Sequence, residues 1–257
     1  MTAKRMTRPE PGSDGTSPVG EPLSDDISPF IGLIGFIARM SLRGLTRVSV
    51  EGALDAVPKR GPLIVASNHL SNADGVLIGG FVTPLLGRRI HWLGKREMVE
   101  WPVLGKLVEA SSIHPVDRGT ADVEAFRLAR RILDEGHVLM VFPEGTRSPT
   151  GALQEARDGL AMLALRTAAP ILPMAVTGTE RFWPRHSYPH PGGRITLRVG
   201  EAFSLPREMT DSTDRRAAKA AATSMIMHRI AELLPADYRG AYGSPVGEVT
   251  PAVGAAE

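Results

Sequence analysis

Short apolar runs of the kind that form β-strands alternate with helical runs from about residue 45 onward. The strand candidates are 62–67, 90–93, 111–116, 137–142, 171–176 and 194–199. The helical candidates are 73–82, 96–109, 120–135, 155–168 and 213–234. Strands that alternate with helices pair into a sheet whose faces the helices cover. The alternation therefore predicts an α/β fold with a central, mostly parallel or mixed sheet flanked by helices.

Four of the seven histidines follow this alternation, at positions 69, 91, 114 and 137. Nearly even spacing of one residue type can be a sign of internal repeats, but the sequences around these histidines do not resemble one another. We interpret the spacing as a by-product of strand–helix units of similar length.

The two ends of the chain differ in composition from the part between them. Residues 1–27 are rich in Pro, Gly, Ser and acidic residues, and they lack both apolar periodicity and the apolar core of a secretory signal. The C-terminal end has a similar composition. We therefore expect a disordered acidic tail over 1–27, a helix over 28–47, one globular domain over 48–239 and a second disordered tail over 240–257.

Charge and cysteine content narrow the possible ligands and chemistry. The net charge is +2, but residues 1–26 and 248–257 each carry −2, which leaves +6 on the residues between them. A moderately basic body favours an anionic ligand or anionic lipid headgroups. Because no nucleic-acid-binding motif is present, we expect no nucleic acid partner. The absence of cysteine excludes disulfides, thiolate metal sites and a cysteine nucleophile.

Residues 28–47 contain the most apolar stretch of the chain. Its uninterrupted part, residues 29–38, is too short to span a bilayer. Arg39, Arg43 and Arg47 then follow at helical spacing and form a basic stripe. Such an amphipathic helix can lie in a membrane interface, and the alternative is a helix that covers the core while its arginines are solvated. We predict a membrane-interface helix with its arginines at the lipid surface.

The segment SNHLSNADG, residues 67–75, follows an apolar strand and precedes a helix. With His69 in the loop and Asp74 in the first helical turn, the carboxylate can accept the proton of one ring nitrogen and leave the other nitrogen free as a base. The alternative is structural, because Ser71 and Asp74 fit a helix-capping box. A GxSxG nucleophile motif is absent, so a base here would act on a hydroxyl of the substrate.

The segment FPEGTRS, residues 142–148, comes directly after a strand candidate. Gly145 permits a left-handed turn, and the planar guanidinium of Arg147 can bind two oxygens of a phosphate or carboxylate. The alternative is a surface turn with a local ion pair between Glu144 and Arg147. Ligands usually bind at the carboxyl ends of strands in α/β sheets, which favours the binding role.

Three further segments are weaker signals. Lys95 lies in GKREM, residues 94–98, and Arg118 lies in IHPVDRG, residues 113–119. Taken alone, both are most simply solvated charges. The segment ILPMAVTG, residues 171–178, indicates only a buried strand.

The segments 94–98 and 113–119 form one block, and in chain order this block stands second among four, after 67–75 and before 142–148 and 171–178. In this order and at these distances, the four blocks resemble the glycerophospholipid acyltransferase superfamily, whose type members are the PlsC-like 1-acyl-glycerol-3-phosphate (lysophosphatidate) acyltransferases. The family's blocks are matched by Asn68, His69 and Asp74; by Lys95, Glu97, Pro102, Gly105, Asp117 and Arg118; by residues 142–148; and by residues 171–176. The resemblance covers about residues 50–200. A lone His-x4-Asp is weak, whereas the complete FPEGTRS block with the others in order is specific.

The resemblance implies a reaction and a set of roles. His69 would be the general base on the free hydroxyl of a lysophospholipid, most simply 1-acyl-glycerol-3-phosphate, and Asp74 would orient it. The hydroxyl would attack the thioester of acyl-CoA or acyl-carrier protein directly, with no acyl-enzyme, no cofactor and no metal. The residues expected to bind the acceptor and its phosphate are Lys95, Arg118, Glu144, Gly145, Thr146 and Arg147.

The family pattern also leaves alternatives open. Where the family often has Lys-x-Gly after FPEGTRS, this chain has Arg157, Asp158 and Gly159. Many relatives carry membrane-spanning helices and this chain has none, so we expect a peripheral protein on the cytoplasmic face of the cell membrane. The acceptor could instead be glycerol-3-phosphate, a glycolipid or an amino lipid.

Two rival classes also remain, a thioester hydrolase that activates water and a catalytically silent lipid-binding protein. His186 and His190 form an H-x3-H pair, but the prolines around them argue against a helix that presents both to a metal. We therefore expect no metal site.

Overall fold

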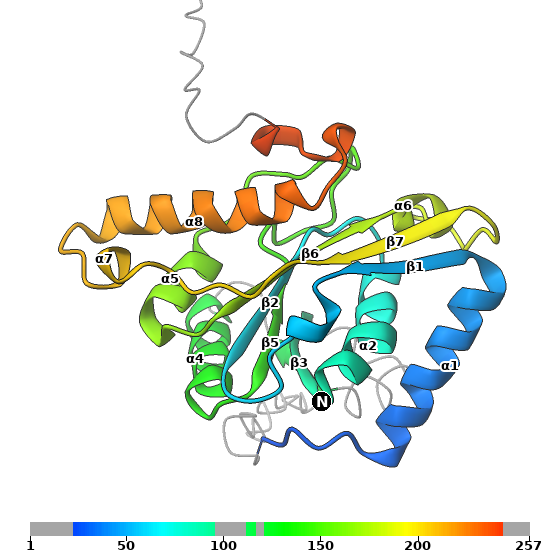
Figure 1. Ribbon diagram of the computed structural model, residues 1–257, viewed down its shortest axis with the longest axis horizontal. Coiled ribbons are helices and arrows are strands. Elements are labelled where there is room, and N and C mark those ends of the chain that lie inside the picture. Colours follow the sequence, from blue (N-terminus) through cyan, green and yellow to red (C-terminus); the bar gives the residue numbers. More distant parts are fainter. Residues whose placement is uncertain (1–22, 96–111, 117–120, 244–257) are drawn as a thin grey trace, which may run out of the picture.

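The computed structural model describes residues 23–95, 112–116 and 121–243, and it confirms the predicted α/β class. Within these ranges seven strands form one sheet in the order β1-β7-β6-β2-β5-β3-β4, with helices on both faces (Figure 1). The strands are β1 (Arg47–Gly52), β2 (Leu63–Ser67), β3 (Ile90–Lys95), β4 (Ile113–Val116), β5 (Val138–Val141), β6 (Ile171–Thr177) and β7 (Arg194–Val199). The helices are α1 (Pro29–Leu45), α2 (Ala73–Leu86), α4 (Ala121–Asp134), α5 (Gly159–Thr167), α6 (Thr179–Phe182), α7 (Arg207–Thr210) and α8 (Arg215–Glu232).

The directions of the strands decide where a site can form. Strand β2 pairs in parallel with β5 and β6, and β3 pairs in parallel with β4 and β5. Strand β7 is antiparallel to β6, and β1 runs with β7. The carboxyl ends of the five parallel strands, β2 to β6, therefore share one edge of the sheet, which is the edge where α/β sheets usually bind ligands.

All six predicted strands are present to within two residues at each end, but β1 was not predicted. Its sequence RVSVEG lies at the edge of the sheet, where its residues are exposed or half-buried, so the apolar signal is weak. The helix predicted over 155–168 begins only at Gly159, and the helix predicted over 96–109 lies outside the described residues.

The hydrophobic core lies in two layers, one on each face of the sheet. Because successive side chains of a strand point to opposite faces, Ile64 and Ala66 of β2 pack with α4, α5 and α8, whereas Leu63 and Val65 pack with α2. Strand β2 is thus buried on both faces, as its uninterrupted apolar sequence requires.

Helix α1 lies over α2 and exposes most of its large apolar side chains. It begins after Ser28, whose Oγ accepts the N–H of Ile31 at 3.3 Å. The two helices pack closely at Gly80 of α2, which lies against Ala38 and the aliphatic part of the Arg39 side chain in α1. The apolar face of α1 comprises the residues that are 42–55% exposed, namely Phe30, Leu33, Phe36, Ile37, Met40 and Leu45. In the described ranges no helix combines the length and apolar character that crossing a bilayer requires.

The predicted arginine stripe is shorter than expected. The helix ends at Leu45, so Arg47 begins β1 and does not continue the stripe. Arg39 lies against α2, and the guanidinium carbon of Arg43 lies 5.3 Å from the ring centre of Phe81. The two helical arginines therefore flank the contact with α2, and the apolar side of α1 is the one that faces solvent.

The structure departs from the predicted tails at their inner margins. Residues 23–27 lie against the domain, where Asp25 forms an ion pair with Arg88 at 2.6 Å. At the other end, the hydroxyl of Tyr242 accepts the backbone N–H of Ala156 at 3.2 Å. Both margins are anchored by contacts far apart in the sequence, which composition does not predict.

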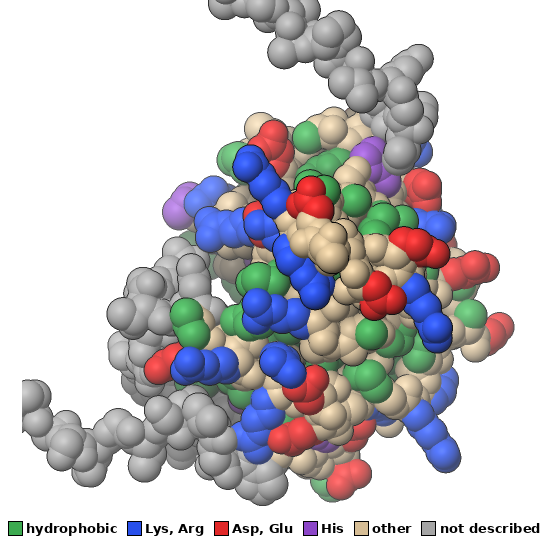
Figure 2. Space-filling model, turned by 90° about the vertical axis from the view of Figure 1, so that its left-hand side faces the viewer, with side chains coloured by type: hydrophobic (Ala, Val, Ile, Leu, Met, Phe, Trp, Pro, Cys, Tyr) green, Lys and Arg blue, Asp and Glu red, His purple; other side chains and the backbone are tan. Residues whose placement is uncertain are grey.

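The basic character of the body is concentrated in part on one face. Figure 2 shows Lys and Arg side chains gathered on the side of the molecule where α4, α5 and α7 lie. A hollow of about 870 Å³ on this side is lined by the cations Arg130, Arg166, Arg215, Arg216 and Lys219.

Candidate active site

Loops from three neighbouring strands meet at the carboxyl edge of the sheet. The loop after β2 carries Asn68 and His69, the loop after β5 spans residues 142–158, and β6 leads into Gly178 and Thr179. Strands β6, β2 and β5 are adjacent in the sheet, so their loops are adjacent too. Segments about 110 residues apart in the sequence thereby reach one site.

Asn68 fixes the backbone immediately before His69. Its side-chain amide donates to the carbonyl of Val176 at 2.9 Å and accepts the N–H of the same residue at 2.7 Å. Asn68 is buried, so both bonds are protected from water. This paired contact ties the end of β2 to β6.

His69 and Asp74 meet as their spacing predicted. Nδ1 of His69 lies 2.8 Å from Oδ2 of Asp74, and the same oxygen accepts the backbone N–H groups of Leu70 at 2.6 Å and Ser71 at 2.8 Å. The contact with Ser71 is half of a capping box, so the structural and the base–orienter interpretations hold together. Asp74 is fully buried, whereas 21% of the His69 side chain is exposed.

The other ring nitrogen of His69 is available for chemistry. Among the described residues, Nε2 of His69 makes no hydrogen bond. The imidazole stacks on Phe142, with ring centres 4.0 Å apart and an interplanar angle of 13°. Its backbone carbonyl accepts the N–H of Ser148 at 2.7 Å. The ring is thus held by Asp74 on one edge and by Phe142 on one face, with Nε2 able to take a proton.

Thr179 completes the environment of Asp74, and the sequence analysis did not identify it. Its Oγ1 donates to Oδ1 of Asp74 at 2.5 Å, so both carboxylate oxygens accept hydrogen bonds in a site without solvent. The available signal was positional: Gly178 and Thr179 directly follow β6 at the same edge as His69.

Glu144 holds two loops together, and its place beside the acceptor stays a prediction. It is 3% exposed, and its two carboxylate oxygens accept the backbone N–H of His69 at 2.7 Å and that of Gln154 at 2.9 Å. Burial raises the pKa of Glu144, because loss of water around the carboxylate outweighs these two hydrogen bonds. With both oxygens engaged, Glu144 is a positioning residue for His69.

The remaining residues of the FPEGTRS loop are more accessible. Gly145 adopts a left-handed φ of 68°, Thr146 is exposed and Arg147 is half-buried. The side chain of Arg157 lies so close to Gly145 that a Cβ there would come within 2.8 Å of it. Arg157, which stands where the family often has Lys, therefore adds a cation at this loop.

The side chain of Lys95, at the end of β3, and the whole of Arg118 lie outside the described residues.

Comparisons with known proteins agree with this geometry. The family model described as Acyltransferase matches residues 47–177, about half of the chain. A 1-acyl-sn-glycerol-3-phosphate acyltransferase of Cocos nucifera is 31% identical over 49% of this chain and 44% of its own length, and one of Pseudomonas aeruginosa is 27% identical over 77% of this chain and 75% of its own length. The chain thus spans less than half of the coconut protein.

A solved structure carries the same fold. The 1-acyl-sn-glycerophosphate (LPA) acyltransferase PlsC from Thermotoga maritima aligns with a TM-score of 0.64 and 25% identity over 79% of each chain. The match to the family model includes β2 with the His69–Asp74 pair, the FPEGTRS loop and β6. The chain belongs to the Acyltransferase family.

Proposed function

We propose that this protein transfers an acyl chain from a thioester to the free hydroxyl of a lysophospholipid, with 1-acyl-glycerol-3-phosphate as acceptor and phosphatidate as product. The observation that carries the proposal is the pair of His69 and buried Asp74 at the carboxyl edge of the sheet, 2.8 Å apart. This is the arrangement of a general base and the group that orients it. The names of the similar proteins support the choice of acceptor.

The proposed step balances without a covalent enzyme intermediate. Nε2 of His69 takes the proton as the acceptor oxygen bonds to the thioester carbon, and Asp74 stabilises the imidazolium that forms. The carbon–sulfur bond then breaks, and the thiolate recovers the proton from His69. The products are the ester and a free thiol, which is consistent with a chain that has no cysteine.

The acceptor phosphate needs cations near this base. Arg147 and Arg157 at the FPEGTRS loop are the described candidates, with Gly145 and Thr146 between them and the strand end. An arginine fork suits a phosphate because it can donate two parallel hydrogen bonds. Lys95 and Arg118 stay predicted contributors to the same phosphate.

The test is a product analysis with matched variants. Purified protein is incubated with acyl-CoA or acyl-carrier protein and a panel of lysolipids, including glycerol-3-phosphate, and products are identified by mass spectrometry. We expect phosphatidate, and we expect His69→Ala to lower turnover by about 10²–10⁴-fold, whereas His228→Ala on α8 keeps it. Thiol release with free fatty acid as the product, independent of acceptor, would mean a hydrolase. Unchanged turnover in His69→Ala would refute the proposed base.

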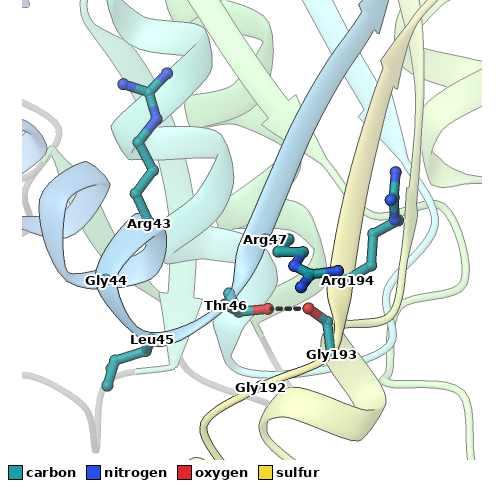
Figure 3. A pocket seen from close by; sticks show the side chains of 8 residues that line it. All are labelled: Arg43, Gly44, Leu45, Thr46, Arg47, Gly192, Gly193 and Arg194. Atoms are coloured by element: carbon teal, nitrogen blue, oxygen red, sulfur yellow. Dashed lines mark hydrogen bonds between the residues drawn. The ribbon is translucent and has the colours of Figure 1, made fainter.

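We also propose that α1 places the protein peripherally on a membrane, on the cytoplasmic face, whose anionic lipids attract basic surfaces. The apolar face of α1 faces solvent although burial of large apolar side chains is favourable. Beside it lies a hollow of about 630 Å³ whose lining includes Arg43, Leu45, Arg47 and Arg194 (Figure 3).

The register of two strands strengthens the expectation of an anion at this hollow. Arg47 of β1 lies directly opposite Arg194 of β7. Like charges opposite one another across two strands repel, and an anionic headgroup between them would relieve that repulsion. Leu45 belongs both to the hollow and to the apolar face of α1, so headgroup and acyl-chain contacts would be adjacent.

Vesicle flotation tests the membrane proposal. Phe30→Ser with Ile37→Ser removes two side chains that are about half exposed, worth ~1 kcal/mol each, so binding should fall about 30-fold. Val123→Ser with Tyr188→Ser removes exposed apolar groups elsewhere and should leave flotation unchanged. Arg47→Gln with Arg194→Gln should remove only the preference for anionic vesicles. Equal flotation of the α1 variant and the control would rule out the helix as the membrane contact.

A further inference from the structure

Three of the four evenly spaced histidines lie together in the folded protein. In the sheet, His91 of β3 is opposite Leu139 of β5, and Leu93 of β3 is opposite His114 of β4. His137 precedes Leu139 by two residues, so all three histidines point to the same face. Our interpretation of their spacing as a by-product is therefore incomplete, because strand order brings His137, His91 and His114 side by side.

The imidazoles of this cluster are in direct contact. Nδ1 of His91 lies 3.0 Å from Nε2 of His114, and the rings are stacked with centres 5.3 Å apart. The ring centre of His137 is also 5.3 Å from that of His91. His91 is 1% exposed, and among the described residues its Nε2 has no hydrogen-bond partner. A buried polar atom without a partner is unusual and points to a missing ligand.

Asp25 brings a carboxylate to this cluster from the segment that precedes α1. Its Oδ1 lies 2.7 Å from Nδ1 of His137, and its Oδ2 accepts from the buried guanidinium of Arg88 at 2.8 Å. Asp25, His91 and His137 each offer one possible ligand atom, and these three atoms all lie within 4.8 Å of one another.

We propose that Asp25, His91 and His137 bind a divalent transition metal ion, for which Zn²⁺ is the best match. Two imidazoles and one carboxylate are ordinary zinc ligands, and three protein ligands leave a fourth position for water. Zinc bonds of ~2.0–2.2 Å keep tetrahedral ligand atoms roughly 3.4 Å apart. Oδ1 of Asp25 and Nδ1 of His137, 2.7 Å apart, would therefore separate slightly, and ligand atoms as far as 4.8 Å apart would approach one another by about an ångström. Asp25 can supply that movement, because it lies in the segment before α1 and not in a strand.

The surroundings of the three residues suit this role. A histidine ligand usually donates its other ring N–H to an acceptor, and Nδ1 of His91 faces Nε2 of His114 for that purpose. Arg88 donates a hydrogen bond to Oδ2 of Asp25, and Oδ1 of Asp25 faces His137.

The metal would be structural. Strand β5 separates His137, at its amino end, from the FPEGTRS loop at its carboxyl end, a distance of roughly 15 Å along the strand. Binding would join residues 23–27 to the amino edge of the sheet and would displace the proton between His137 and Asp25. It would not touch the His69–Asp74 pair, so its success or failure is independent of the proposed acyl transfer.

Calorimetric titration of the full, untagged, chelator-treated chain with ZnCl₂ tests the proposal. We expect one Zn²⁺ per chain, and a melting temperature raised by roughly 5–10 °C when free Zn²⁺ is 100 times Kd. Asp25→Asn and His91→Gln should each weaken binding by roughly 100-fold or more, and His114→Gln by about 10-fold. His186→Gln with His190→Gln is the matched control and should bind as the unmodified chain does.

Co²⁺ in place of Zn²⁺ adds a spectroscopic measure, since a tetrahedral site absorbs strongly in the visible range and Asp25→Asn should abolish that absorption. If His91→Gln does not fold, as judged by circular dichroism, Asp25→Asn decides the question. The proposal would be overturned if the unmodified chain showed no saturable Zn²⁺ binding. It would also be overturned if binding survived in Asp25→Asn and was lost in the His186/His190 variant.

Discussion

The hydroxyl of Thr179 offers the sharpest test of how the site is built. Thr179→Val removes the one described hydrogen bond to Oδ1 of Asp74 while keeping the shape of the side chain. A hydrogen bond to a charged group contributes about 1.5–3 kcal/mol, and Asp74 is fully buried, so water cannot replace the donor. The free energy of unfolding should fall by about 2 kcal/mol, which lowers Tm by roughly 4–8 °C for a domain of this size.

The same loss should appear in catalysis, because the imidazolium of His69 depends on Asp74 in the proposed transition state. If the whole 1.5–3 kcal/mol were expressed there, turnover would fall by about 10- to 150-fold. We expect kcat of Thr179→Val to fall about tenfold, measured in a coupled thiol-release assay with lysophosphatidate. Because Thr179 is fully buried, KM should change little.

Thr179→Ser is the matched control, since it keeps the hydroxyl and removes only a methyl group. It should retain kcat to within about twofold. If Thr179→Val matched the unmodified protein in both Tm and kcat, or if Thr179→Ser were damaged as much as Thr179→Val, the hydrogen bond to Asp74 would not have the role described here.

Two other substitutions test the FPEGTRS loop. Glu144→Gln leaves one acceptor for two backbone donors, including that of Gln154, so urea denaturation should show a loss of about 1–3 kcal/mol. Because the pKa of Glu144 is raised in the folded state, the stability gap between the two proteins should be widest below its ordinary pKa of 4.5 and should narrow as pH rises through the raised pKa; a gap that widens with pH would contradict this. Gly145→Ala forces a left-handed residue and displaces the side chain of Arg157, at a cost of about 1–2 kcal/mol; KM for lysophosphatidate should rise, and an unchanged KM would remove this loop from the acceptor site.

The sequence predicted the fold well where a strand is buried on both faces. Strands such as β2 and β6 are apolar at every position before their last residue, so they can be predicted without knowledge of their partners. The edge strand β1 was missed because all of its residues are exposed or half-buried, so its composition resembles that of a loop. Arg47 was consequently assigned to a helix that ends two residues earlier.

Local spacing alone indicated that His69 and Asp74 can meet, since five residues across a loop and a first helical turn suffice. The order of motifs was equally sufficient to indicate the family. These features depend on short segments, and short segments determine their own periodicity and turns.

The partners of those residues depended on the tertiary structure. Thr179 reaches Asp74, Glu144 joins two backbones, and His91 meets His137 only because β6, β2, β5 and β3 lie side by side in that order. The physical reason is that strand order is set by long-range pairing and by burial of both faces of the sheet, which no local pattern records. The sequence thus determined which segments carry the chemistry, and the packing of the sheet decided which side chains act on one another.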